Sequence, residues 1–211
     1  AREQIVAVLP SVLALAIGGS AVGTGLNTPP QWSETVIKHI CDVTGIHFSS
    51  AENKFMALAG HEALTDLHSR LRLLATALFK ISNDLRLMAS GPRCGLGEIY
   101  LPENELGSSI MPGKVNPTQI EALTMVALQV MGNDVAVGLA NSQGQFELNV
   151  YKPLIFRNVF ESIHLLADAI NSFSAHCLQG IGANEKKLAH NMEQSLMLVT
   201  VLSPIIGYDL A

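Results

Sequence analysis

Apolar positions recur at helical spacing along most of this chain. From Ser50 to Met88 they recur every three or four residues, which predicts one long amphipathic helix that ends at Gly91-Pro92. The same periodicity predicts further helices at 2–17, 31–43, 120–140, 147–177, 184–193 and 195–201. No stretch of any length shows the alternation typical of paired strands. The pattern therefore predicts an all-α fold, an elongated up-down helical bundle.

Composition supports helices packed on helices. Of the 211 residues, 48% are hydrophobic, but only 5% are aromatic and 15% are charged. A β-sandwich would carry more tyrosine, tryptophan and threonine. The mean hydropathy of +0.31 is high for a soluble monomer. We therefore expect much of the apolar helix surface to be buried against other chains.

Charge and cysteine content exclude several classes of partner. The net charge of -5, with no basic run, gives no electrostatic reason to expect nucleic acid. The longest apolar run, 5–17, is too short to span a bilayer, and residues 1–4 make a poor signal peptide. The three cysteines lie far apart without metal-ligand spacing, which predicts reduced thiols in a cytosol or organelle matrix. They are Cys41, Cys94 and Cys177.

The candidate chemistry lies in the loop 107–117, with the sequence GSSIMPGKVNP. Its glycines and prolines exclude regular structure. It holds the hydroxyls of Ser108 and Ser109, the ammonium of Lys114 and the amide of Asn116, which suit a small, doubly anionic substrate. A hydroxyl in a positive field can act as nucleophile or base. The alternative is that the two serines only cap a turn.

This loop also carries a family resemblance. It is similar to the signature loop of the fumarase/aspartase superfamily, and its flanks, LPENE at 101–105 and TQIEA at 118–122, resemble class II fumarate hydratase. The resemblance covers essentially the whole chain. Further similar stretches are AVGTGLNT at 21–28, SGPRCG at 90–95 and FELNV at 146–150.

The resemblance implies a domain organisation. Residues 1–204 would form the family's central helical bundle domain, truncated on its N-terminal side, with the signature loop at 104–117. Residues 205–211 would begin a small C-terminal domain. The abrupt start and end of the sequence add the expectation that it is a piece of a longer protein.

The resemblance also implies catalytic roles. Ser108 occupies the position of the family's catalytic base, and Glu121 resembles the acidic residue that polarises the catalytic histidine. An acidic residue in the first turn of a helix also complements the helix dipole, which is the alternative explanation for Glu121. Ser109, Lys114, Val115 and Asn116 match the family's substrate contacts; a solvated loop lysine is the alternative for Lys114.

None of the histidines is a candidate for catalysis. All seven lack metal-ligand spacing or pairing with a serine in the sequence, and the family's catalytic histidine lies upstream of residue 1. We expect surface or satisfied core positions for them. They are His39, His47, His61, His68, His164, His176 and His190.

Other polar groups interrupt the apolar pattern. Thr24, Asn27 and Thr28 lie in a glycine-rich loop, where they either line a site or brace a tight connection. Asn53-Lys54 and Asn133-Asp134 interrupt predicted helices, and such groups usually serve packing networks or subunit contacts.

The function implied by the resemblance is the reversible hydration of fumarate to (S)-malate by general acid-base catalysis, without metal or organic cofactor. It implies a homotetramer with active sites shared between subunits, in the cytoplasm or mitochondrial matrix, and no membrane or nucleic-acid partner. Two alternatives stay open. One is aspartate ammonia-lyase or another superfamily lyase, against which Thr118-Gln119 argues. The other is a non-catalytic helical oligomerisation module, and these residues alone are predicted to be inactive.

Overall fold

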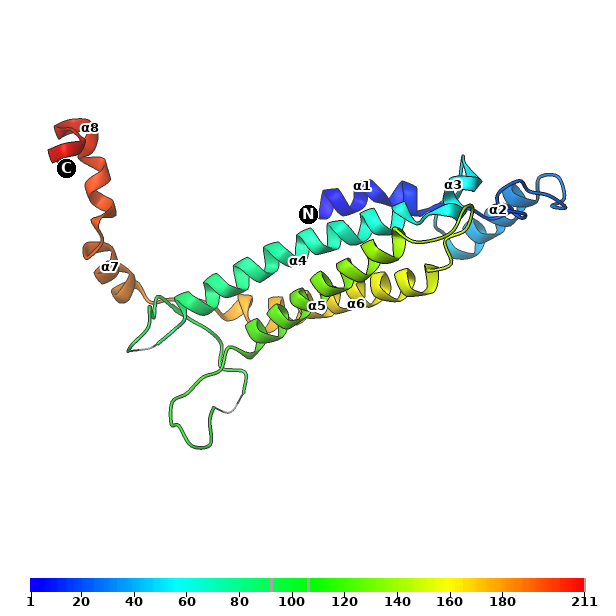
Figure 1. The fold of residues 1–211 in the computed structure, drawn as a ribbon. Coiled ribbons are helices and arrows are strands. Elements are labelled where there is room, and N and C mark those ends of the chain that lie inside the picture. Colours follow the sequence, from blue (N-terminus) through cyan, green and yellow to red (C-terminus); the bar gives the residue numbers. More distant parts are fainter. Residues whose placement is uncertain (92, 106, 211) are drawn as a thin grey trace. The chain divides into compact units, whose positions relative to one another are not determined.

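The computed structural model describes residues 1–91, 93–105 and 107–210. Helices dominate these residues, which confirms the all-α prediction (Figure 1). The chain divides into two compact units: unit 1 comprises 1–80 and 122–171, and unit 2 comprises 81–121 and 172–211. Three predicted features include a residue outside the described ranges: the helix stop at Pro92, the signature loop at Leu106 and the C-terminal tail at Ala211.

The core of unit 1 lies between antiparallel helices. These are α1 (Arg2–Val12), α4 (Glu62–Met88), α5 (Thr118–Asn141) and α6 (Lys152–His176). One buried cluster joins the start of α4, at Leu67, to the end of α5, at Val137, and the start of α6, at Ile155. A second joins later α4, at Ala75, to earlier α5, at Ala127. The reversed order along α5 shows the up-down arrangement that the periodicity predicts.

The long helix predicted from Ser50 to Met88 is interrupted. Its first part is the short helix α3 (Lys54–Ala59), which Asn53 caps by accepting the Met56 N–H at 3.0 Å. The extended Gly60, at φ -141°, ends α3, and α4 begins at Glu62. The prediction of one continuous helix from Ser50 to Met88 was wrong because the apolar periodicity continues across this break.

The first predicted helix, 2–17, ends early. Helix α1 stops at Val12, and β1 (Ala14–Leu15) then pairs in parallel with β2 (Ser49–Ser50). The ladder is short, but the Ala51 N–H donates to the Leu15 carbonyl at 2.8 Å and ties the two segments together. The next helix, α2 (Trp32–Thr44), agrees with the prediction and ends at the left-handed Gly45.

Helix α6 begins five residues later than predicted because Asn149 organises a turn before it. The buried Asn149 side chain donates to the carbonyls of Ala140 and Gln143, at 3.1 and 3.0 Å, and accepts the Tyr151 N–H at 2.9 Å. These bonds hold the backbone in a loop that joins the end of α5 to the start of α6 at Lys152. Pro153 then lies in the first turn, where a proline is tolerated.

A polar network crosses the core of unit 1 at His68. Its Nδ1 lies 2.9 Å from Asp134 Oδ1 and its Nε2 lies 2.9 Å from Ser162 Oγ. Asn133 donates to the same hydroxyl at 3.1 Å, and Arg72 reaches the second Asp134 oxygen at 2.7 Å. No sequence pattern indicated this histidine–serine contact, and the expected satisfied core position is confirmed for His68. Because His68 and Ser162 are completely buried, no substrate reaches this serine.

A second buried histidine gives a prediction about acid stability. Burial lowers the pKa of His61 below its ordinary value of 6.5, and the ring Nε2 donates to the Asn149 carbonyl at 3.0 Å. The unfolded chain then binds more protons than the folded one below about pH 6.5, so stability is full above that pH and falls as the pH drops. We expect urea unfolding to show this loss, at most about 1.4 kcal/mol per pH unit.

The matched variants are His61→Asn and His47→Asn, since His47 is exposed. The first should flatten the dependence of the unfolding free energy between about pH 7.5 and pH 5.5, and the second should leave it unchanged. Equal slopes in all three proteins would show that His61 does not carry the effect.

Unit 2 is built from short elements. The Asn184 side chain donates to the Gly97 carbonyl at 2.9 Å, and its N–H donates to the Glu98 carbonyl at 2.8 Å, which fixes α7 beside β3. The elements are β3 (Ile99–Tyr100), antiparallel to β4 (Gly182–Ala183), then η1 (Leu178–Gly180), α7 (Glu185–Glu193), η2 (Leu196–Val201), α8 (Ser203–Ile206) and η3 (Tyr208–Leu210). Asn184 caps α7 and Ser195 caps η2, at the starts of the helices predicted at 184–193 and 195–201.

Among the described residues, one helix, α5, is long and apolar enough to cross a membrane by length and composition alone. The core helix of a soluble protein passes the same test. In α5 the buried positions recur every three or four residues, and they include the polar Asn133. They are Ile120, Leu123, Ala127, Val130, Asn133, Val137 and Ala140. That periodicity is typical of a helix that packs one face against protein.

Candidate functional site

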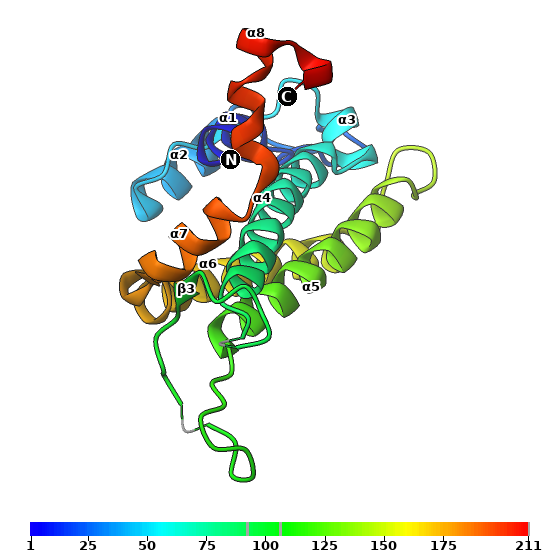
Figure 2. The same cartoon turned by 90° about the vertical axis from the view of Figure 1, so that its left-hand side faces the viewer.

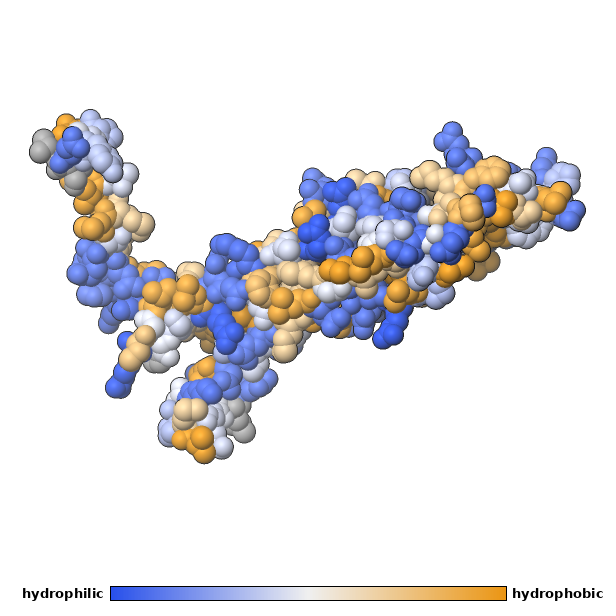
Figure 3. Space-filling view, in the orientation of Figure 1, coloured by the Kyte–Doolittle hydropathy of each residue, from blue (hydrophilic) through white to orange (hydrophobic). Residues whose placement is uncertain are grey.

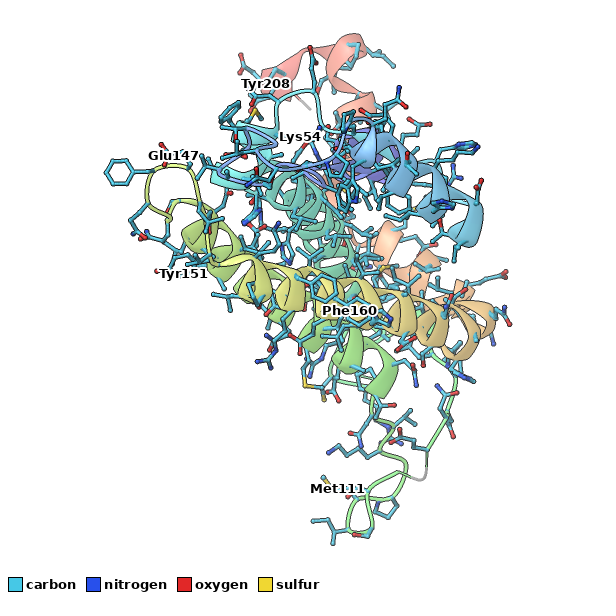
Figure 4. All side chains as sticks on the ribbon, turned by 90° about the vertical axis from the view of Figure 1, so that its right-hand side faces the viewer. Lys54, Met111, Glu147, Tyr151, Phe160 and Tyr208 are labelled. Carbon is cyan, nitrogen blue, oxygen red and sulfur yellow. The ribbon has the colours of Figure 1, made fainter. Side chains whose placement is uncertain are left out.

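The signature hairpin, residues 107–117, leaves the segment after β3 and returns to the start of α5 (Figure 2). Its two arms touch at Gly107, where an added Cβ would collide with the Lys114 carbonyl oxygen. Only glycine permits this approach. The tip turns through Gly113, at φ 76°, and the Lys114 N–H donates to the Met111 carbonyl at 3.3 Å. Met111 lies at the far end of the hairpin (Figure 4).

The hydroxyl of Ser108 is held by the hairpin backbone. Its Oγ accepts the N–H of Ile110 at 3.3 Å and the N–H of Met111 at 3.2 Å. This is the turn-capping arrangement that the sequence left open. The same two donors favour a negatively charged oxygen over a neutral hydroxyl. The geometry therefore suits both the bracing of a turn and the support of an alkoxide.

The predicted substrate contacts share this hairpin. Ser109, Lys114, Val115 and Asn116 are all exposed, so their polar groups are open to a ligand. Because the arms meet at Gly107 and Lys114, the serine arm runs beside the arm that carries the ammonium and the amide. Within the described part of the chain, Lys114 makes no ion pair. Its charge remains available to an anion.

Glu121 lies outside the hairpin, in the first turn of α5. Its Oε1 accepts a hydrogen bond from the Arg86 guanidinium at 3.1 Å, in a pair whose members are both partly exposed. Arg86 is a site neighbour that the sequence analysis missed, because 35 residues separate the two and no local spacing links them. The position of Glu121 also complements the N-terminal end of the helix dipole.

The base of the hairpin is anchored within unit 2. Asn104 donates to the His176 carbonyl at 2.7 Å, and Ser172 donates to the Gln119 side chain at 2.8 Å. Both bonds tie the ends of the hairpin to the last part of α6. The hairpin that carries the candidate chemistry is thereby anchored on both sides, at Asn104 and at Gln119.

The loop of Thr24, Asn27 and Thr28 belongs to unit 1, where the two threonines brace their own backbone. Thr24 donates to the Ala21 carbonyl at 2.9 Å and accepts the Leu26 N–H at 3.2 Å. The Thr28 hydroxyl lies 2.8 Å from that of Ser20. The bracing alternative therefore describes these threonines, and both also line a cavity considered below.

The site thus consists of a serine- and lysine-bearing hairpin that leads into the first turn of α5. A family model described as lyase matches residues 1–132, so the chain belongs to that lyase family. The chain is 58% identical over 208 residues to the class II fumarate hydratase of Campylobacter jejuni, covering 99% of this chain and 45% of that protein. It is 59% identical over 208 residues to the class II fumarate hydratase of Methylorubrum extorquens, covering 99% and 44%.

Solved structures agree with this assignment. The class II fumarase of Schistosoma mansoni superposes with a TM-score of 0.96 at 48% identity, covering 99% of this chain and 47% of that one. A fumarate lyase:delta crystallin from Brucella melitensis gives a TM-score of 0.92 at 39% identity, covering 99% and 45%. The chain thus spans somewhat less than half the length of the relatives that it matches.

Proposed function

We propose that this chain contributes the signature hairpin to an active site that reversibly hydrates fumarate to (S)-malate. The observation that carries the proposal is the closed hairpin, which holds the Ser108 oxygen on two backbone donors beside a free lysine. The names of the curated relatives support the choice of substrate. The chain covers 45% of one such relative, which supports the expectation that the complete activity draws on residues beyond these 211.

In the direction of dehydration, Ser108 as an alkoxide takes a proton from C3 of malate. The electron pair of the broken C–H bond moves into the adjacent carboxylate and forms a dianionic aci-carboxylate. Lys114, Asn116 and the hairpin amides stabilise that charge, and one such donor typically contributes about 2.7–4 kcal/mol. The electron pair then returns to form the carbon–carbon double bond as the C2–O bond breaks.

The departing hydroxyl needs a proton to leave as water. No residue of this chain is assigned as that acid; the family resemblance gives the role to a histidine outside these residues, acting through water. Glu121 would orient and polarise that histidine. The Arg86 guanidinium donates to Glu121 Oε1 at 3.1 Å and helps to orient that carboxylate.

The choice between hydration and ammonia release is open to a direct test. We expect the full-length protein to form fumarate from (S)-malate and to leave L-aspartate unchanged, both followed by fumarate absorbance. The Thr118-Gln119 pair, which begins α5 directly after the hairpin, favours this result. Release of ammonia from aspartate at a rate comparable to malate dehydration would replace the proposal with an ammonia-lyase.

We further propose a homotetramer as the working assembly. Helix α5 supports this, because it exposes an apolar face of Met125, Val135 and Leu139, which are 65%, 61% and 63% exposed. Apolar residues reach the surface at several places on the face shown in Figure 3. On the same side of α5, Gly132 has no atom within 4 Å of an added Cβ, which leaves room for a close backbone neighbour.

Residues 1–211 alone should therefore show negligible malate turnover but a mass well above that of one chain by light scattering. Val135→Glu should shift the mass toward the monomer, since a buried carboxylate without a partner strongly opposes association. Val43→Glu is the matched control, because Val43 is exposed on α2, away from that face. A monomeric wild type, or equal effects of both variants, would contradict the assembly.

A location in the cytoplasm or mitochondrial matrix belongs to the same proposal. It is supported by the free thiols Cys41, Cys94 and Cys177. We assign the exposed apolar face of α5 to protein rather than lipid, since the buried face of that helix carries the hydrogen-bonded Asn133.

A further inference from the structure

A polar cavity of about 880 Å³ lies in unit 1 and has no role in the proposed hydration. Its walls are the loop 18–31, the first turn of α2 and the segment 52–55 that leads into α3. The β1–β2 ladder holds the two arms of this wall together just before they diverge. The cavity is therefore formed by local structure within one unit.

The loop that forms the cavity has an unusual backbone. Ala21, Val22, Asn27 and Gln31 all have φ between 49° and 63°, in the left-handed region. That region is costly for a β-branched residue such as Val22, at about 1–3 kcal/mol. Hydrogen bonds keep the conformation in place, including the Ser20 hydroxyl on the Leu26 carbonyl at 2.6 Å. Strain of this kind commonly accompanies a binding function.

Two adjacent glycines bring the polar walls together. A Cβ on Gly18 would collide with the Ser33 hydroxyl, and a Cβ on Gly19 would lie 3.2 Å from the Lys54 Cβ. Gly18 also has φ 81°, which favours glycine. Ser33 and Lys54 therefore lie on either side of two consecutive residues, and both line the cavity.

Ser33 is the decisive residue. It is only 8% exposed and lines the cavity, and its hydroxyl makes no hydrogen bond to another described residue. The hydroxyl is therefore free to bond a ligand or water in the cavity. Ser33 also lies in the first turn of α2, whose N-cap Gln31 makes no capping side-chain bond, so the N–H groups of Ser33 and Glu34 have no partner within the helix.

The charged side chains around the cavity indicate which ligand charges it can bind. Lys54, at the start of α3, is partly buried and makes no ion pair within the described part of the chain (Figure 4). Together with the α2 terminus and the Ser33 hydroxyl it forms a site for one oxyanion. Glu34 and Glu52 also line the cavity and are exposed, so they repel a second negative charge and attract a positive one.

We propose that this cavity binds a small molecule with a single phosphate or carboxylate group and a neutral or cationic remainder. The oxyanion is held by the Ser33 hydroxyl, the first-turn amides of α2 and Lys54. The remainder lies against Glu34 and Glu52. This site is separate from the hairpin residues assigned to the hydration.

The test uses two probes that share a phosphate and differ in the remainder. Phosphoethanolamine carries an ammonium group and phosphoglycolate carries a carboxylate. Isothermal titration of the full-length protein should show tighter binding of phosphoethanolamine, by about fivefold or more. The fluorescence of Trp32, which lines the cavity and is the single tryptophan of this sequence, should change with the same affinity.

Variants separate this site from others. Lys54→Gln should weaken phosphoethanolamine binding about tenfold, and Ser33→Ala about fivefold, since each removes a hydrogen-bond donor to a charged group. Lys38→Gln is the matched control, because Lys38 is exposed on α2 and does not line the cavity. Glu34→Gln should reduce the ratio of the affinities for phosphoethanolamine and phosphoglycolate. Because Glu34 is exposed, this variant still tests the inference if Lys54→Gln fails to fold.

The outcomes decide the inference independently of the proposed function. Ser108→Ala should lower kcat for malate dehydration by about 10²–10⁴-fold and leave phosphoethanolamine binding unchanged. If neither probe binds saturably, if Lys38→Gln weakens binding as much as Lys54→Gln, or if phosphoglycolate binds more tightly, the inference is wrong. If Ser108→Ala removes phosphoethanolamine binding, the probe occupies the hydration site and the inference also fails, while the hydration proposal stands.

Discussion

Replacement of Ser108 by alanine in the full-length protein is expected to lower kcat for malate dehydration by about 10²–10⁴-fold, the usual contribution of a positioned general base. The variant removes the oxygen proposed to take the C3 proton but keeps the Ile110 and Met111 amides that now hold it. KM should change less than kcat, because the proposed carboxylate contacts Ser109, Lys114 and Asn116 are unaltered. Initial rates from fumarate absorbance measure both quantities.

The control for this variant is Ser195→Ala. Ser195 likewise accepts a backbone N–H two residues ahead, from Met197 at 3.2 Å, but it caps η2 and has no assigned chemistry. It should retain wild-type turnover. Malate dehydration at the wild-type rate in Ser108→Ala would contradict the assignment of Ser108 as the base. An equal loss of kcat in Ser195→Ala would indicate that the effect comes from turn stability.

Replacement of His68 by leucine is expected to cost about 2–4 kcal/mol of unfolding free energy. The substitution fills a similar volume, but it deprives Asp134 Oδ1 and Ser162 Oγ of their bonds to the imidazole in the core of unit 1. Arg72 still reaches the other Asp134 oxygen, so part of the network survives. Urea unfolding at matched protein concentration, followed by circular dichroism, measures the change.

His164→Leu is the matched control, since His164 is exposed on α6 and only its Nδ1 bonds to the backbone, at the Phe160 carbonyl. It should change the unfolding free energy by less than about 0.5 kcal/mol, as is usual for surface substitutions. If His68→Leu is as stable as the wild type, the network is not a determinant of the core.

The sequence predicted the helices well where apolar periodicity and caps agree. Gly45 ends α2, and Asn184 begins α7, as their residue types indicate. The errors arose where one buried polar side chain or one glycine redirects the backbone. Asn149 delays α6 and Gly60 divides α3 from α4, and periodicity contains no signal for either because it reports burial rather than backbone direction.

The candidate site was predictable to the extent that it is local. Ser108, Ser109, Lys114, Val115 and Asn116 share one hairpin, so a contiguous motif locates them. Contacts between distant segments correspond to no contiguous motif in the sequence. The Arg86–Glu121 pair and the His68–Ser162 bond each depend on how separate helices pack, which single-sequence reasoning does not give. The assigned roles of the hairpin residues stay predictions until the kinetic tests above.

The support of the Ser108 oxygen by main-chain amides has a consequence for mutagenesis. Because the donors belong to the peptide groups of Ile110 and Met111, truncating either side chain leaves both hydrogen bonds in place. An alanine scan would pass over these two positions as silent. Proline, which has no N–H, or a backbone ester would reveal the contribution of these amides. Positions 110 and 111 can therefore accept many side chains and still require their backbone N–H groups.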